Sequence, residues 1–220
     1  MIKFLRKLLG TTTQIVFPQR CPYCRNLVEE TEYACKNCRK DMPQDGIYQG
    51  VLGGYRCASR LPYQGRYKRA VLNFKFNGKK QHKTQFAQIL YEEVSRYYED
   101  MVFDYVTFVP MHKKAFKKRG YNQCKLLAQE LSKLMGIPCV KVIEKVKNTD
   151  PQHKLTAKKR KTNLKGAFKI IDKSQIKGKT ILIIDDIITT GSTLSECAKT
   201  INKAKPQMIC CLTLLSVTEK

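Results

Sequence analysis

Glycine and proline are scarce in this sequence, which has 12 and 8 of them among 220 residues. Linkers and fibrous chains are rich in these two residues, so both classes are excluded. No run approaches the roughly 18 apolar residues of a membrane-spanning helix. A secretory signal is also absent, because Lys3, Arg6 and Lys7 interrupt the first apolar residues. We therefore expect a cytoplasmic protein. A short amphipathic helix over residues 2–9 is expected to pack against the protein itself, and binding to the inner face of the membrane is the alternative.

Acidic residues are few as well. Asp and Glu number 18 against 42 Lys and Arg, which gives a net charge of +24. Residues 101–220 carry 24 basic and 9 acidic side chains, a net charge of +15. Such an excess indicates a negatively charged partner, namely nucleic acid, an anionic membrane surface or a polyphosphate ligand. A basic surface that serves only solubility is the alternative.

Ten cysteines are present, and a reducing compartment disfavours disulfides between them. Cys21-x2-Cys24 and Cys35-x2-Cys38 form two pairs separated by ten residues. Four thiolates at this spacing are typical of a closed, tetrahedral, structural zinc site, and two disulfides or a redox-active pair are the alternatives. The remaining cysteines lie apart from these pairs and are interpreted as small buried hydrophobes: Cys57, Cys124, Cys139, Cys197, Cys210 and Cys211.

The apolar pattern predicts alternating helices and strands after the cysteine pairs. Helices are expected over 67–76, 84–98, 122–135 and 192–204, and strands over 104–110, 139–144, 167–171, 180–185 and 208–217. This alternation is typical of an α/β fold with a parallel sheet. The expected organisation is an N-terminal helix and zinc ribbon in 1–50, followed by an α/β domain in 51–220.

One segment, Ile181 to Thr193, combines features that suit a phosphorylated sugar. Asp185 and Asp186 follow a run of aliphatic residues, and a loop that opens a helix comes next. Ligands of open α/β sheets bind beyond the carboxyl ends of strands, where such a loop presents N–H groups to phosphate. The loop residues expected to contact phosphate are Thr189, Thr190, Gly191, Ser192 and Thr193. The two carboxylates can accept hydrogen bonds from the vicinal hydroxyls of a ribose, and a buried strand that ends in a helix-capping turn is the alternative.

These thirteen residues resemble the phosphoribosyl-pyrophosphate signature of type I phosphoribosyltransferases. The resemblance implies that fold and assigns the catalytic positions to Asp185 and Asp186, with Mg²⁺ bound together with the ligand. It also implies that the loop after the strand at 104–110 binds pyrophosphate through Lys113, Lys114 and Arg119. A solvated basic turn is the alternative for the lysines.

Further motifs resemble the ComF family of competence proteins. They are Tyr63-x-Gly65-x-x-Lys68, Phe74-Lys75-Phe76-x-Gly78, Arg119-Gly-Tyr-Asn-Gln123, and the series Gln152, Leu155, Arg160, Asn163 and Gly166-Ala-Phe168. The resemblance covers residues 18–217 and implies a protein that acts on incoming single-stranded DNA alongside a helicase-like competence ATPase. Many family members carry Arg at the start of the loop that follows residue 144, where this chain has Lys145 and Lys147.

Basic runs predict the nucleic-acid contacts, which are Lys117, Lys118, Lys158, Lys159, Arg160 and Lys161. Phe116 and Tyr121 are interleaved with them and could stack on bases. Three functions stay open: a DNA-handling protein that binds phosphoribosyl pyrophosphate, an active phosphoribosyltransferase with an unknown acceptor, and a zinc-ribbon scaffold whose second domain is inert.

Overall fold

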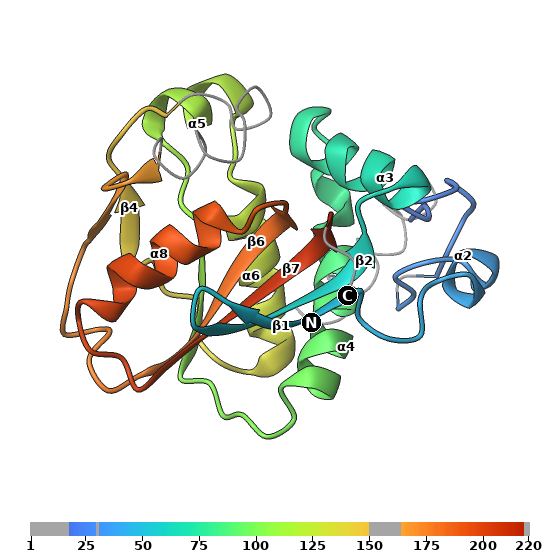
Figure 1. The fold of residues 1–220 in the computed structure, drawn as a ribbon. Helices are drawn as coiled ribbons and strands as arrows, with labels where there is room; N and C mark the ends of the chain where they lie inside the picture. Colours follow the sequence, from blue (N-terminus) through green and yellow to red (C-terminus); the bar gives the residue numbers. More distant parts are fainter. Residues whose placement is uncertain (1–17, 30, 150–163, 218–220) are drawn as a thin grey trace, which may run out of the picture.

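The computed structural model describes residues 18–29, 31–149 and 164–217 (Figure 1). The elements in chain order are α2 (Lys36–Lys40), β1 (Tyr48–Leu52), β2 (Tyr55–Pro62), α3 (Gly65–Phe76), η1 (Lys80–His82), α4 (Lys83–Tyr97), β3 (Tyr105–Phe108), α5 (Lys113–Arg119), α6 (Gln123–Met135), β4 (Ile143–Lys145), β5 (Phe168–Ile170), β6 (Thr180–Ile188), α8 (Ser192–Asn202) and β7 (Met208–Ser216). The expected helix over residues 2–9 lies outside the described residues.

A five-stranded sheet in the order β1-β2-β7-β6-β3 forms the centre of the molecule. β2, β7, β6 and β3 are parallel, and β1 pairs antiparallel with β2 at one edge. Ile181–Ile184 of β6 are all fully buried, because a parallel strand in the middle of a sheet is covered on both faces. The predicted α/β fold with a parallel sheet is confirmed.

Helices cover both faces of this sheet (Figure 1). α4 and α6 contact each other on one face, where α4 packs on β2 and β7 and α6 packs on β3 and β6. α8 lies on the other face, in contact with β6 and β7. The small antiparallel sheet of β4 and β5 lies beside α8.

The cysteine module packs directly on α3 and α4. The ring of Tyr23 meets Tyr67 and Phe86 edge to face, with centroids 5.3 and 6.4 Å apart. The hydroxyl of Tyr67 donates to the carbonyl of Asp41 at 3.0 Å, and the Arg66 guanidinium pairs with the Asp41 carboxylate at 3.1 Å. Buried aromatic contacts and an ion pair therefore join the module to the α/β domain.

Several elements differ from the sequence-based expectation. The hairpin of β1 and β2 was not predicted, since Tyr48-Gln-Gly-Val-Leu52 shows no apolar alternation. The expected domain division after residue 50 falls within β1. The strand expected over 139–144 covers only Ile143–Lys145, while Cys139 forms an isolated bridge with Val106. The basic segment 113–119 is helix α5 rather than a turn.

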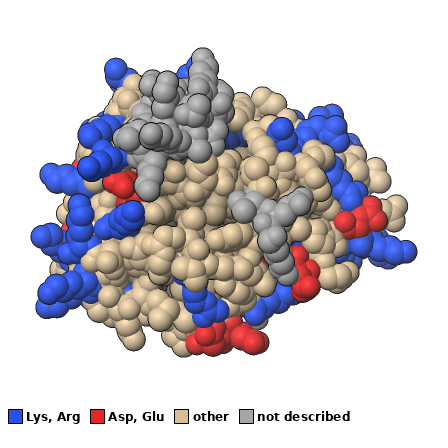
Figure 2. Space-filling model, viewed as in Figure 1, with Lys and Arg blue, Asp and Glu red and all other residues tan. Residues whose placement is uncertain are grey.

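The visible face of the molecule has a broad central area without charged side chains, and lysines and arginines lie along its margins (Figure 2). Within the described residues, no helix is long and apolar enough to cross a membrane.

Candidate functional site

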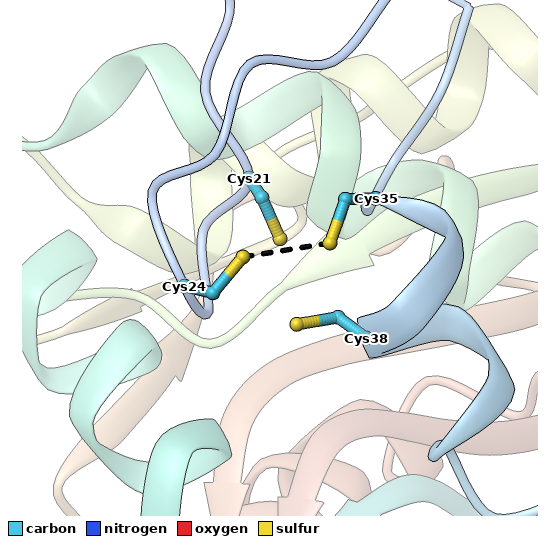
Figure 3. A group of neighbouring side chains, drawn as sticks. All are labelled: Cys21, Cys24, Cys35 and Cys38. Carbon is cyan, nitrogen blue, oxygen red and sulfur yellow. Dashed lines mark hydrogen bonds between the residues drawn. The ribbon is translucent and has the colours of Figure 1, made fainter.

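The four paired cysteines converge at one point (Figure 3). Their sulfur atoms all lie within 4.8 Å of one another, and Cys24 Sγ is 3.4 Å from Cys35 Sγ. A zinc ion with four bonds of about 2.3 Å has sulfur–sulfur edges of about 3.8 Å, so the arrangement fits a tetrahedral zinc site. All four are free cysteines, as are the other six, so the disulfide alternative has no support. Arg66 Nη1 lies 3.8 Å from Cys38 Sγ and can stabilise the negative charge of a zinc-bound thiolate.

Asp185 and Asp186 lie within β6, which extends beyond its neighbour β3. The pairing of these two strands ends at Phe108 and Ile184, so both aspartates lie beyond the end of β3. Their side chains are buried, with residue exposures of 7% and 2%. The strand expected over 180–185 is longer than predicted, because β7 continues to pair with β6 as far as Ile188.

Three side chains from other elements bind the two carboxylates. Lys75 Nζ, at the end of α3, is 2.7 Å from Asp186 Oδ2. Gln123 Nε2, at the start of α6, donates to the same oxygen at 3.2 Å. The Cys124 thiol donates to Asp185 Oδ1 at 3.2 Å. Cys124 is thus buried as predicted, but it is also a hydrogen-bond donor to the acid pair.

Burial decides the electrostatics of this group. Burial and the adjacent Asp186 carboxylate raise the pKa of Asp185 to about 7, against the opposing effect of the Lys75 ammonium. Burial also raises the pKa of the Cys124 thiol, which therefore keeps its proton and donates it. Cys124, Asp185 and Asp186 offer three possible metal-ligand atoms within 4.8 Å of one another. Because the Lys75 ammonium pairs with Asp186, it supplies the positive charge that a metal ion would otherwise bring.

The predicted phosphate loop follows β6 and opens α8. Gly191 has a φ of 67°, a left-handed conformation that favours glycine. The Leu52 side chain of β1 lies so close that a Cβ at position 191 would collide with it. The hydroxyls of Thr190 and Ser192 are 2.8 Å apart.

A small pocket joins this loop to the acid pair. Asp185 lines it together with Thr189, Gly191, Ser192 and Thr193, and Asp186 and Thr190 are not among its lining residues. Its volume of about 20 Å³ holds about one water molecule. This pocket is therefore too small to enclose a phosphoribosyl group.

The expected pyrophosphate residues lie at opposite ends of α5. Lys113 and Lys114 are exposed in the first turn of α5. Arg119 ends that helix, donates to Gln123 Oε1 at 2.6 Å, and lies 4.8 Å from the centre of the Phe76 ring. Arg119 thus belongs to the hydrogen-bond network around Asp186.

Two of the six expected nucleic-acid contacts are described. Lys117 and Lys118 are exposed on α5 beside Phe116, which is 48% exposed. The predicted stacking role of Tyr121 was wrong, because its ring is buried and its hydroxyl donates to the carbonyl of Phe74. The other four contacts lie outside the described residues: Lys158, Lys159, Arg160 and Lys161.

Known proteins share both parts of this architecture. The Double zinc ribbon domain family matches residues 12–48, and the Phosphoribosyl transferase domain family matches residues 118–220. Competence protein F of Haemophilus influenzae is 30% identical over 189 residues, which cover 83% of this chain and 79% of the relative. The chain belongs to the competence protein F (ComF) family. Its fold is that of type I phosphoribosyltransferases, joined to a zinc ribbon.

Other relatives of this ComF-family chain have similar lengths. The DNA utilization protein YhgH of Salmonella typhimurium is 29% identical, with 87% of this chain and 88% of the relative covered. Competence protein ComFC of Bacillus subtilis is 30% identical, with 89% and 77% covered. Among solved structures, an adenine phosphoribosyltransferase overlays 67% of this chain and 75% of its own, with 14% identity and a TM-score of 0.41.

Two of the ComF-like motifs meet at the acid pair. Phe74-Lys75-Phe76 provides the ammonium and one aromatic ring, and the segment from Arg119 to Gln123 provides the guanidinium and the amide. Lys75 and Gln123 belong to motifs that resemble those of the family, yet no role was expected for them. Their membership in these two motifs was the only signal in the sequence.

Lys145 also lies near this site. Lys145 Nζ, in β4, is 5.8 Å from the centre of the Phe168 ring. Burial lowers the pKa of Lys145, and the nearby Cys197 and Asp185 oppose that shift. Lys147 Nζ instead donates to the carbonyl of Lys165 at 2.9 Å.

Proposed function

We propose that this chain is a competence protein for DNA uptake and natural transformation that binds a phosphoribosyl-pyrophosphate-type ligand and single-stranded DNA. The observation that carries the ligand assignment is the meeting of Lys75, Gln123 and Arg119 around an acid pair next to the phosphate loop. Burying two carboxylates beside a cation and an amide costs free energy, so packing alone does not explain this strand end.

In this proposal Asp185 and Asp186 accept hydrogen bonds from the ribose hydroxyls. Residues 189–193 receive the 5′-phosphate through backbone N–H groups and hydroxyls. Lys113 and Lys114, exposed at the start of α5, attract the pyrophosphate. Mg²⁺ would be bound together with this ligand and would offset the negative charge of the pyrophosphate.

The DNA part of the proposal rests on charge and on the names of relatives. Relatives are named competence and DNA utilization proteins, and this chain carries a net charge of +24. Lys117 and Lys118 are exposed, and with residues 158–161 they would neutralise phosphates of a single strand. A cytoplasmic location, at the inner face of the membrane and beside a helicase-like competence ATPase, completes the proposal.

One observation favours a second function, active phosphoribosyl transfer. A carboxyl group with a pKa of about 7, as for Asp185, is suited to take a proton from an acceptor near neutral pH. Release of pyrophosphate that depends on an added acceptor would establish this activity. Asp185→Asn should then abolish release.

Ligand binding is tested by calorimetry with phosphoribosyl pyrophosphate and Mg²⁺. Asp185→Asn plus Asp186→Asn should weaken binding at least about a hundredfold, which is about 3 kcal/mol. The control, Asp100→Asn plus Asp172→Asn, makes the same change in charge on two carboxylates away from the site and should bind like the parent. Equal affinity of the site variant and the parent would exclude the two aspartates as ribose contacts.

DNA binding is tested with a labelled oligothymidylate at roughly 50 mM salt, where phosphate contacts are strong. Lys117→Glu plus Lys118→Glu should reduce the slope of log affinity against log salt by at least about 1.4, since each contact contributes about 0.7. No binding by the parent, or binding that is insensitive to salt, contradicts the DNA part of the proposal.

A further inference from the structure

A second pocket lies where the zinc ribbon meets the α/β domain. Its volume is about 350 Å³, within the range of about 300–1,000 Å³ that small-molecule sites occupy. Its walls come from α2 of the ribbon, from β2 and from α4. Figure 1 places α2 at the right-hand edge and α5 at the upper left, so this pocket is remote from the lysines of α5.

Positive charge dominates the lining. α2 contributes Lys36, Arg39 and Lys40, and the α/β domain contributes Arg60 and Arg96. Glu92 is the one acidic residue among those lining this pocket, and its carboxylate accepts a hydrogen bond from the hydroxyl of Tyr33 at 3.2 Å. The lining is therefore strongly cationic.

The two arginines of the α/β domain already have structural roles. Arg60 is 4% exposed, and its Nη1 donates to the carbonyls of Pro43 and Asp45 at 2.7 and 3.2 Å. Arg96 donates to the carbonyl of Gln44 between them. Together they bind the segment that leads from the ribbon to β1 and so fix the floor of the pocket. The Arg60 charge is partly balanced by the buried Glu93 carboxylate, 3.8 Å away.

The lysines of α2 have no such balance. Lys36 and Lys40 are exposed, four positions apart on one helix, and form no ion pair within the described part of the chain. Like charges at this spacing destabilise a helix. Arg39, between them, pairs with Glu32 at 3.4 Å. An anion in the pocket would relieve the repulsion between the two lysines.

We propose that this junction pocket binds a phosphate-bearing ligand, with Lys36 and Lys40 as the phosphate contacts and the Tyr33 ring as a stacking surface for a base. Lysine is a compact point charge that binds phosphate without demanding one geometry. The bond from Tyr33 to Glu92 holds the ring in place beside the lysines. Stacking on an aromatic ring is a common way of holding a base of a single strand.

The phosphate can come from single-stranded DNA or from a free nucleotide. The DNA binding proposed above favours single-stranded DNA. The choice of DNA over a nucleotide rests on the proposed function, whereas the assignment of a phosphate site does not. The pocket also gives the zinc ribbon a role. α2 begins directly after Cys35 and contains Cys38, so the metal site would hold the two lysines in position.

The test compares Lys36→Gln plus Lys40→Gln with the control Lys173→Gln plus Lys177→Gln. Both variants remove two exposed lysines four positions apart, and the control pair is absent from the lining of the pocket. Fluorescence anisotropy with a labelled oligothymidylate is measured over a salt series, and thymidine 5′-monophosphate is titrated by calorimetry. The pocket variant should reduce the slope of log affinity against log salt by about 1.4, which corresponds to two phosphate contacts, and the control should not. Tyr33→Leu should lower affinity without changing that slope.

Each outcome either distinguishes DNA from a free nucleotide as the ligand or contradicts binding at the junction pocket. A reduced slope in the pocket variant alone supports DNA as the source. Unchanged DNA binding with loss of nucleotide binding in the pocket variant alone supports a free nucleotide. If pocket variant and control behave alike with both probes, the pocket proposal is overturned, while the DNA function stands as long as the parent binds the oligonucleotide. A parent that binds no oligonucleotide defeats the DNA function, and only nucleotide binding that depends on Lys36 and Lys40 then supports the pocket.

Discussion

Replacing Lys75 with methionine tests the electrostatics of the acid pair most directly. The ammonium of Lys75 is 2.7 Å from Asp186, whose side chain is only 3% exposed. Methionine keeps much of the length and apolar volume of lysine but removes the charge. Asp186 would then remain buried beside Asp185 with no cation in contact.

The expected loss follows from burial. Removing one partner of a buried ion pair costs about 3–5 kcal/mol, because the other charge is left uncompensated. The Lys75 side chain retains 22% exposure, so we expect the lower end, about 3 kcal/mol, at pH 8. At pH 5 the loss should be smaller. Asp185 is protonated at pH 5, because its pKa is about 7, so Lys75→Met leaves less buried negative charge uncompensated than at pH 8.

Urea unfolding at pH 5 and pH 8 measures this difference. The control is Lys179→Met, which breaks an ion pair of similar length, 2.9 Å, with Asp104. Those side chains are 48% and 35% exposed, so the control should lose less than about 1 kcal/mol. Adding Asp186→Asn to Lys75→Met should restore part of the stability, because the unpaired charge is removed.

The reasoning is refuted if Lys75→Met is as mild as Lys179→Met at pH 8. It is also refuted if the loss in Lys75→Met is the same at both pH values, since the expected loss comes from ionised carboxylates.

Three more predictions concern the zinc site, the phosphate loop and Asp185. Elemental analysis should find about one zinc per chain, lost together with protease resistance of the ribbon in Cys21→Ser plus Cys24→Ser and retained in Cys139→Ser. In urea unfolding, Gly191→Ala should destabilise the fold more than the control Gly178→Ala. Both glycines have φ near 70°, but only at position 191 would the new methyl group meet Leu52. Equal losses in the free energy of unfolding would show that this contact is unimportant. Asp185→Asn should gain stability relative to the parent as the pH rises from about 4 to about 7. The reason is that folded Asp185 keeps its proton up to a pH of about 7, whereas an unfolded aspartate releases it near pH 3.9. Parallel curves of unfolding free energy against pH for the two proteins over this range would contradict the raised pKa.

Local sequence patterns were sufficient for much of the fold. The spacing of the four cysteines predicted a single cluster, since thiolates two residues apart reach one ion. The aliphatic run at 181–184 predicted a strand buried on both faces, and helix and strand periodicity located most elements after residue 60. The proposed phosphate loop could also be recognised in the sequence, because its acids, hydroxyls and glycine are consecutive.

Tertiary structure decided which side chains work together. Gln123 and Asp186 are 63 positions apart, and the periodicity of the sequence does not predict that they share a hydrogen bond. Tyr121 lies in a basic segment, yet it is buried because α3 packs over it. The junction pocket combines α2 with β2 and α4, and α2 meets these two elements only because the ribbon docks on the α/β domain. Residue order thus determined the elements and the proposed phosphate loop, whereas the packing of distant segments determined the partners of each buried charge. The reason is that periodicity records only whether a side chain faces the core, and says nothing of which other side chain it meets there.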